Sequence, residues 1–194
     1  MSFDPSRFSQ MVVSDTCAVW NMLSARRLFS AAVAAKVYFC ITSMVAYECF
    51  FKPRSRITAE SEELMKRLQN AQKNGAFRIQ PCGLDDLLNV TRTAPKGLGA
   101  GELSCIAVAY NIRSLAFMTD EKQARYHAEV RLKLAVETTP RLYGFLHFHR
   151  HLSDSDHAEI IAEHERFEQR PLTSFFNEAY EHAMRSRCMA SPPK

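Results

Sequence analysis

The sequence predicts an α/β fold in which a parallel sheet is covered by helices. Short runs of apolar, β-branched and aromatic residues alternate with longer segments of helical character. Two of the short runs end at an aspartate, Asp15 and Asp120, and ligands of open α/β sheets bind beyond such strand ends. The 194 residues contain no internal repeat and no linker, so one domain is expected.

The elements of the N-terminal half follow from composition and from capping residues. Strands are expected where apolar and β-branched residues dominate, at 11–15, 37–41 and 77–80. Helices are expected where strong helix formers dominate, at 19–35, 43–48, 58–74 and 84–91. Ser43 is the expected N-cap of the second helix and Thr58 that of the third, which Gly75 should end.

The C-terminal half continues the alternation and then becomes helical. The expected order is a loop at 95–101, a helix at 102–110, a strand at 115–118, a helix at 121–131 and a strand at 134–138. The expected organisation is an N-terminal arm at 1–10, one domain at 11–188 with a helical tail from about 153, and a disordered end at 189–194.

Composition predicts a reduced, cytoplasmic protein. Apolar residues make up 46% and charged residues 24%, as is typical of globular domains. The longest apolar stretch, 37–51, includes Glu48 and is too short to span a membrane. The acidic Asp4 and the lack of an apolar core argue against a secretory signal. The six cysteines form no CxxC pair, which favours free thiols over disulfides or a structural zinc site.

Four acids lie in local contexts that can bring them to one point: Asp15, Glu48, Glu102 and Asp120. Glu102 opens a helix after a glycine-rich turn, and Glu48 lies in an apolar stretch. Gathered carboxylates repel one another unless a cation lies between them, and Mg²⁺ or Mn²⁺ is the usual cation of an all-oxygen site. This pattern predicts a metal-dependent enzyme that cleaves phosphodiesters.

Each acid also has a purely structural interpretation. Asp15 and Asp120 are suitable helix caps, and Glu102 is an acid favoured in the first turn of a helix. Glu48 suits an exposed amphipathic face. All four interpretations must hold together to exclude a site.

The charge distribution suits a polyanionic substrate without proving one. The net charge is +4, and 122–151 carries six Lys or Arg against two Glu, whereas 154–168 carries six acids against one Arg. Two solvated faces of opposite sign explain this equally well. Lys122 and Arg125, about one helical turn apart, are candidates to contact phosphate or are simply solvated.

Taken in order, four stretches resemble the PIN-domain family of nucleases: VVSDTCAVW, ITSMVAYECF, LGAGELSCIAVA and LAFMTDEKQARYHA. The resemblance covers about residues 11–170. It implies a PIN-like fold with about five parallel strands and a Mg²⁺- or Mn²⁺-dependent ribonuclease. Many members are VapC-like toxins of toxin–antitoxin pairs, so an antitoxin partner and a homodimer are also implied.

The resemblance assigns roles to particular side chains. It implies that Asp15, Glu102 and Asp120 hold one or two metal ions, with Glu48 and Glu121 as outer partners.

The resemblance also assigns supporting roles to hydroxyl groups, and the chain departs from the family pattern at two positions. Thr16 and Thr119 are expected to orient a ligand or a water. Cys17 stands where the family often has Ser, and Glu121 stands for the second Asp of a Thr-Asp-Asp motif. Two alternatives remain open: a DNA-directed nuclease of the same superfamily, and a PIN-like nucleic-acid-binding module without catalysis.

Two further motifs carry weaker predictions. His147, His149 and His151 would share one side only on a strand, so surface or RNA-facing histidines are preferred to a transition-metal site. Gly97, Gly99 and Gly101 lack the Gly-Lys-Ser/Thr ending of a P-loop and predict only a turn.

Overall fold

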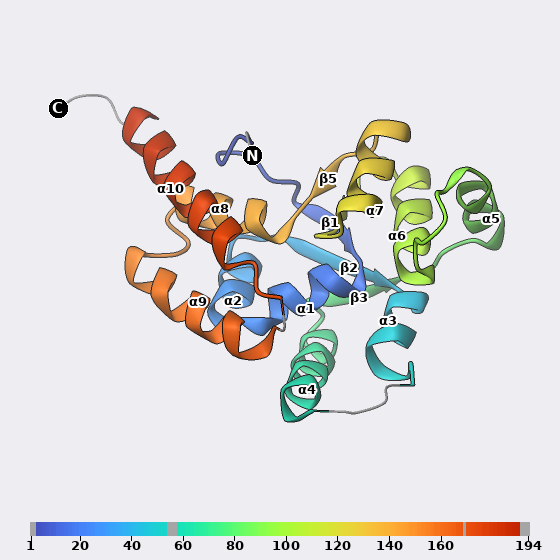
Figure 1. Ribbon diagram of the computed structural model, residues 1–194, viewed down its shortest axis with the longest axis horizontal. Helices are drawn as coiled ribbons and strands as arrows, with labels where there is room; N and C mark the ends of the chain where they lie inside the picture. Colours follow the sequence, from blue (N-terminus) through green and yellow to red (C-terminus); the bar gives the residue numbers. More distant parts are fainter. Residues whose placement is uncertain (1–2, 54–57, 169, 191–194) are drawn as a thin grey trace.

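The computed structural model describes residues 3–53, 58–168 and 170–190, and it confirms the α/β fold (Figure 1). Five parallel strands form one sheet in the order β3-β2-β1-β4-β5. The strands are β1 Met11–Ser14, β2 Tyr38–Thr42, β3 Phe77–Gln80, β4 Ala116–Met118 and β5 Val136–Glu137.

Helices cover the sheet on both sides. They are α1 Thr16–Ser24, α2 Arg26–Ala34, α3 Ser43–Phe50, α4 Ala59–Lys73, α5 Leu84–Thr93, α6 Ala100–Asn111, α7 Lys122–Tyr126, the π-helical turn η1 His127–Arg131, α8 Thr139–Phe148, α9 Asp154–Phe167 and α10 Thr173–Ala190. Helix α6 packs across β1, β2 and β4, whereas α1 packs against α2, α4, α8 and α9. Figure 1 shows α9 and α10 on the opposite side of the molecule from α5 and α6.

The strand order brings the ends of β1 and β4 together. Strand β1 pairs with both β2 and β4, with Val13 opposite Cys40 on one side and Phe117 on the other. The chain leaves β1 toward β2 and returns later to β4, so a topological switch point lies between β1 and β4. Asp15 follows β1 directly, and its backbone N–H donates to Met118 O at 3.1 Å.

The central strands are buried on both faces, which explains their continuous apolar sequences. Val12, Val13, Phe117 and Met118 are fully buried. Burial of each large apolar side chain stabilises the fold by about 1.5–3 kcal/mol. The strand ends are therefore fixed firmly enough to position polar groups.

The predicted helix at 19–35 is wrong in one respect, because two helices meet there at Ala25. Ala25 has extended backbone angles, φ −115° and ψ 113°. The carbonyls of Leu23 and Ser24 accept hydrogen bonds from Arg67 Nη1 of α4, at 2.8 and 2.9 Å. The helix ends because a side chain distant in sequence satisfies its last carbonyls.

The other elements agree in type and differ at their ends. Thr42, rather than Ser43, caps α3 by accepting from Val45 N–H, and β5 is shorter than predicted. Helix α6 begins two residues before Glu102, and the helix expected at 121–131 changes to a π-helical turn. Strand β3 and the Thr58 cap of α4 are confirmed.

The described residues near both ends of the chain contact the domain, and the last helix reaches into the segment predicted as a disordered tail. His182 Nε2 contacts Phe3 O at 2.6 Å, and Ser9 donates to Glu137. Helix α10 continues to Ala190, and the rest of the predicted tail, 191–194, lies outside the described residues. No described helix is both long and apolar enough to cross a bilayer.

Candidate active site

Asp15 is the most deeply buried acid of the predicted site, with 1% of its surface exposed. Its Oδ1 accepts the Ala18 N–H at 2.8 Å, so Asp15 does cap α1. Its Oδ2 accepts no hydrogen bond of good geometry within the described residues, although the Thr119 side chain approaches the carboxyl closely enough to lower its pKa. Burial raises the Asp15 pKa to about 8, and the charges of Asp120 and Glu102 add to this effect. The cap therefore explains only one of the two oxygens.

Asp120 lies two residues beyond β4 and is clamped by three donors. Its Oδ2 accepts from Asn21 Nδ2 at 2.8 Å and from Thr139 Oγ1 at 2.6 Å, and its Oδ1 accepts the Thr139 N–H at 2.9 Å. Burial nevertheless raises the Asp120 pKa. The cap position of α7 belongs to Glu121, so Asp120 does not cap that helix.

Glu48 is half-buried on α3 and turned toward α6. Thr16 Oγ1 donates to Glu48 Oε2, and the Gly101 N–H donates to Oε1 at 3.0 Å. A Cβ at position 101 would lie 2.5 Å from Glu48 Oε2, so only glycine permits this approach. The glycine-rich loop thus makes room for Glu48, which does not lie on an exposed amphipathic face.

Glu102 is the third residue of α6 and accepts the Gly99 N–H at its Oε2. Burial raises its pKa, as do the charges of Glu121 and Glu48, whereas the Gly99 N–H and Lys52 act in the opposite direction. Glu102 is thus a first-turn acid and a neighbour of the other carboxylates. We call Asp15, Glu48, Glu102 and Asp120 the acid cluster.

Predicted supporting residues surround the acid cluster. Thr119 is buried and close enough to Asp15 to lower its pKa, and its Oγ1 accepts the Glu121 N–H at 3.1 Å. Glu121 is exposed, and its charge acts on Glu102. Lys122 is exposed, whereas Arg125 is half-buried and its charge lowers the Asp120 pKa.

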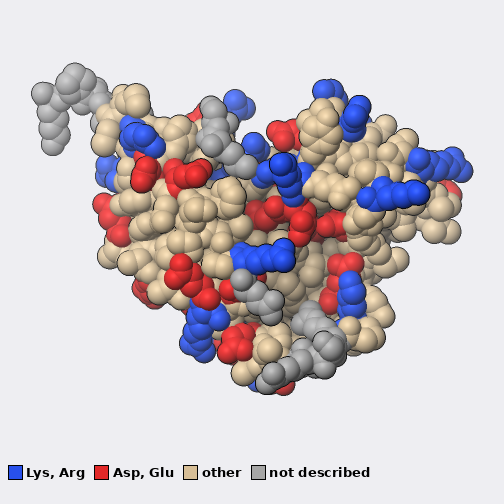
Figure 2. All heavy atoms as spheres, in the orientation of Figure 1, with Lys and Arg blue, Asp and Glu red and all other residues tan. Residues whose placement is uncertain are grey.

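Figure 2 shows acidic side chains gathered in the middle of one face, between α9 and α10 on one side and α3 and α6 on the other. Lys and Arg side chains lie on either side of this acidic area. A polyanion laid across the face would meet positive charge before and after the acids. The net charge of +4 is modest, but the local separation of acidic and basic side chains on this face is pronounced.

Sequence reasoning missed four side chains that contact or neighbour the acid cluster: Asn21, Lys52, Thr139 and Glu168. Burial and the charge of Asp120 raise the pKa of Glu168 to about 7. Glu168 belongs to the acidic segment 154–168, which in sequence has the pattern of a solvated face. Asn21 carried a weak signal, because it lies on the same helix that Asp15 caps.

Cys17 stands beside the acids but is not an activated thiol. Burial raises the pKa of its thiol, and the charges of Asp15, Asp120, Glu121 and Glu168 raise it further. The group therefore stays protonated at neutral pH. Its role is that of a small, partly buried side chain in the wall of the site.

The donor set fits a hydrated hard cation better than a closed protein cage. Among the described residues, no three His, Cys, Asp or Glu side chains are arranged so that they could hold a metal ion by themselves. Glu48 and Glu102 are turned toward backbone amides. Mg²⁺ keeps several waters and needs only one or two direct carboxylates, and Asp15 Oδ2 is a buried oxygen without a partner.

The three clustered histidines do not share one side. His147 is buried on α8, whereas His149 and His151 are exposed beyond it. The ring of His147 packs against Tyr143 and Tyr180, with ring centroids 4.6 and 4.9 Å away. The predicted surface position is therefore wrong for His147, which the aromatic rings enclose, whereas His149 and His151 are exposed as expected.

Comparison with known proteins adds no family assignment. No family model matches the chain, and searches of curated proteins and solved structures return no significant match. The residues of the acid cluster and their geometry are therefore the basis for any assignment of function.

Proposed function

We propose that this protein is a PIN-like, Mg²⁺- or Mn²⁺-dependent endoribonuclease. The observation that carries the proposal is the buried Oδ2 of Asp15, which accepts no hydrogen bond of good geometry among the described residues while the charges of Asp120 and Glu102 act on it. Such an arrangement costs free energy in the protein alone, and a bound cation would offset that cost. The order of the four motifs along the chain supports the same family.

The roles of the acids follow from their hydrogen bonds. Asp15, through Oδ2, is the candidate for a direct ligand, whereas Asp120 already accepts three hydrogen bonds and offers only the remaining lone pair of Oδ1. Glu48 and Glu102 already accept backbone N–H groups and suit contacts through water. A divalent cation held here would lower the pKa of a bound water and offset negative charge on the phosphate.

Neighbouring residues keep the acids in place. Asn21 and Thr139 fix the orientation of the Asp120 carboxylate with three hydrogen bonds. Thr16 and Gly101 do the same for Glu48. Such partners limit the side-chain motion that would otherwise weaken cation binding.

Basic residues near the acid cluster support a nucleic-acid substrate. The charge of Arg125 acts on Asp120, and that of Lys52 acts on Glu102. Lys122 lies at the exposed start of α7. We infer that these three side chains contact phosphates on either side of the cleaved bond.

One observation favours a second function. The described acids are not arranged as a ready-made metal cage, and this spacing also suits a PIN-like nucleic-acid-binding module without catalysis. A DNA-directed nuclease of the same superfamily would use the same residues. RNA as substrate, an antitoxin as partner and a homodimer are supported by the motif resemblance alone.

Cleavage of matched, labelled RNA and DNA panels in Mg²⁺, Mn²⁺ or EDTA tests the proposal. We expect metal-dependent cutting of RNA that Asp15→Asn and Asp120→Asn abolish. The control Asp85→Asn changes an exposed acid in the first turn of α5 and should leave cutting intact. Cutting that survives both cluster variants would refute the site, and binding without cutting would favour the module.

The toxin assignment makes a separate prediction. Expression of the active chain should arrest growth, and Asp15→Asn should remove the arrest. Normal growth with demonstrably active nuclease would argue for a housekeeping enzyme instead.

A further inference from the structure

Glu168 is an additional acid beside the acid cluster, contributed by the C-terminal helices. It follows α9 directly and is half-buried. The charge of Asp120 acts on Glu168, and the charges of both act on the Cys17 thiol. Within the described part of the chain, no hydrogen bond or ion pair compensates the Glu168 carboxylate.

One face of α1 receives the end of α9. Cys17, Asn21 and Ser24 lie at positions i, i+4 and i+7 of that helix and therefore share a face. Cys17 neighbours Glu168, Asn21 donates to Asp120, and Ser24 contacts His164 of α9 at 2.6 Å. The helix that Asp15 caps is thus also the support for the segment that carries Glu168.

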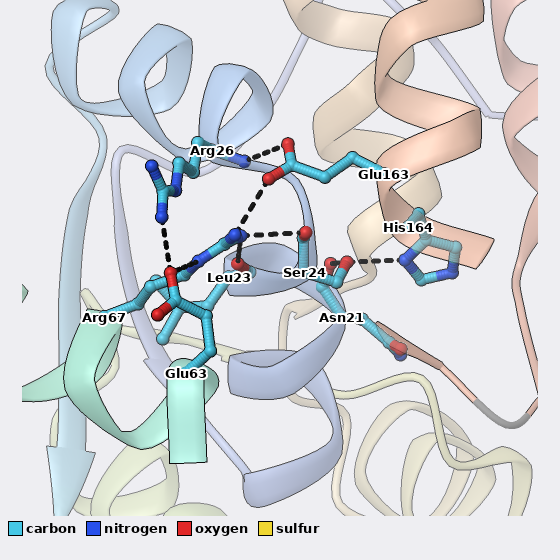
Figure 3. Close-up of polar contacts among 8 residues, drawn as sticks. All are labelled: Asn21, Leu23, Ser24, Arg26, Glu63, Arg67, Glu163 and His164. Carbon is cyan, nitrogen blue, oxygen red and sulfur yellow. Dashed lines mark hydrogen bonds and ion pairs between the residues drawn. The ribbon is translucent and has the colours of Figure 1, made fainter. Parts of the chain in front are cut away.

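One ion pair joins α9 to α4, and hydrogen bonds join α1 to both of these helices (Figure 3). Arg67 Nη2 binds Glu163 Oε1 at 2.9 Å, while its Nη1 donates to the Leu23 and Ser24 carbonyls. Arg67 also pairs with Glu63 at 3.2 Å. Its side chain is only 11% exposed, so these contacts are screened less than surface pairs.

Three described residues close to Glu168 in sequence, Phe167, His164 and Leu172, are held as well. Phe167 packs beneath Arg67, whose Cζ lies 4.4 Å from the ring centroid. His164 Nε2 accepts the Leu172 N–H at 2.8 Å, and its Nδ1 contacts the Ser24 hydroxyl. Because Ser24 Oγ donates to Asn21 O at 2.6 Å, the His164 Nδ1–H is the donor of that pair. Glu168 therefore lies between two anchored points.

Such anchoring brings an uncompensated carboxylate to a place that already carries negative charge. A structural role would supply Glu168 with a donor or a cation, as Arg67 does for Glu163. The second sign of a ligand here is Asp15 Oδ2, which is buried and unpartnered in the same cluster. Both features are explained if a cation binds among these oxygens.

We propose that Glu168 is a fifth carboxylate of the cation site, which the C-terminal helices bring to Asp120. This inference rests on the proposed function. It makes the end of α9 part of the active site rather than an added tail. The carboxylate would contribute charge and a water-mediated or direct oxygen beside Asp120.

Mn²⁺ binding to the full chain at pH 8, measured by calorimetry, tests this role without reference to activity. We expect Glu168→Gln to weaken Mn²⁺ affinity about tenfold, the lower end of the effect of ligand-supporting groups. Glu168→Asp keeps the charge on a shorter side chain and should lose less. The matched control Glu159→Gln removes an exposed acid from the same helix and should bind like wild type.

Thermal unfolding in EDTA separates a functional role from a structural one. Glu168→Gln should be at least as stable as wild type, because the repulsion from Asp120 is removed; clear destabilisation would overturn the inference. Equal Mn²⁺ affinity of wild type and Glu168→Gln would also overturn it, while leaving the acid cluster intact. If Glu159→Gln lost as much Mn²⁺ affinity as Glu168→Gln, the effect would come from the net charge of the protein and not from a site at Glu168, and the inference would be overturned. Absence of Mn²⁺ binding by wild type would overturn the cation site itself.

Discussion

Replacement of Asp15 by asparagine should stabilise the protein at alkaline pH when no cation is present. The folded state raises the Asp15 pKa from 3.8 to about 8, so the folded protein binds a proton that the unfolded chain releases. A raised pKa contributes stability that is present below pH 3.8 and is lost as the pH rises through about 8. An asparagine side chain does not ionise, so Asp15→Asn should not lose this stability as the pH rises.

The expected size of the effect follows from the pKa difference. Each unit of that difference is worth about 1.4 kcal/mol, so metal-free wild type loses about 5 kcal/mol between pH 4 and pH 8. The asparagine Oδ1 can still accept the Ala18 N–H. Its Nδ2 replaces an oxygen without a partner, and an unsatisfied donor costs about 1–3 kcal/mol. Asp15→Asn should therefore gain about 2–4 kcal/mol at pH 8, and at pH 5 it should be equally stable or up to about 2 kcal/mol less stable than wild type.

Urea denaturation in EDTA at pH 5, 6.5 and 8 measures this difference. Mn²⁺ added at pH 8 should raise the stability of wild type and leave that of Asp15→Asn unchanged. The reasoning is refuted if Asp15→Asn is the less stable protein at pH 8 in EDTA, or if its advantage is the same at every pH.

Three further predictions concern the supports of the site. Burial lowers the His164 pKa to about 4, so its neutral form contributes stability above pH 6.5 that is lost as the pH falls toward 4. Urea denaturation should show the free energy of unfolding of wild type falling over this pH range, and a His164→Gln variant should lack this part of the fall. Gly101→Ala places a Cβ against Glu48 and should reduce nuclease activity about 10–100-fold while circular dichroism stays native. Arg67→Met leaves Glu163 partly buried without its cation and should cost about 3–5 kcal/mol in urea denaturation.

Local signals were sufficient for several elements. Helix α4 has its cap at Thr58 and its stop at Gly75, whose φ of +74° suits glycine, and neither depends on distant residues. Strand β3 begins and ends as its composition predicts. The parallel direction of the strands follows from the alternation of strands and helices along the chain, because a helix connects each strand to the next.

Long-range contacts explain what local signals missed. The break between α1 and α2 depends on Arg67, which is over 40 positions away along the chain. The π-helical turn η1 lies where a regular helix was expected. Propensity within a window of residues cannot reveal such contacts.

Some members of the acid cluster could be predicted from local sequence, and others depend on long-range packing. Asp15 and Asp120 were predictable together, because the ends of adjacent parallel strands meet at one edge. The approach of Glu48 to Gly101 needed the packing of α3 on α6. Glu168 was not predictable, because its place depends on how α9 docks on α1. In sequence it has the pattern of a solvated acidic face.

The central claim is that the acid cluster holds a divalent cation, and anomalous diffraction from crystals soaked in Mn²⁺ tests it most directly. The account predicts an anomalous peak within coordination distance of Asp15 Oδ2 or Asp120, and no such peak in Asp15→Asn crystals. Mn²⁺ bound only at another place, in protein that cuts RNA with Mn²⁺, would contradict the account.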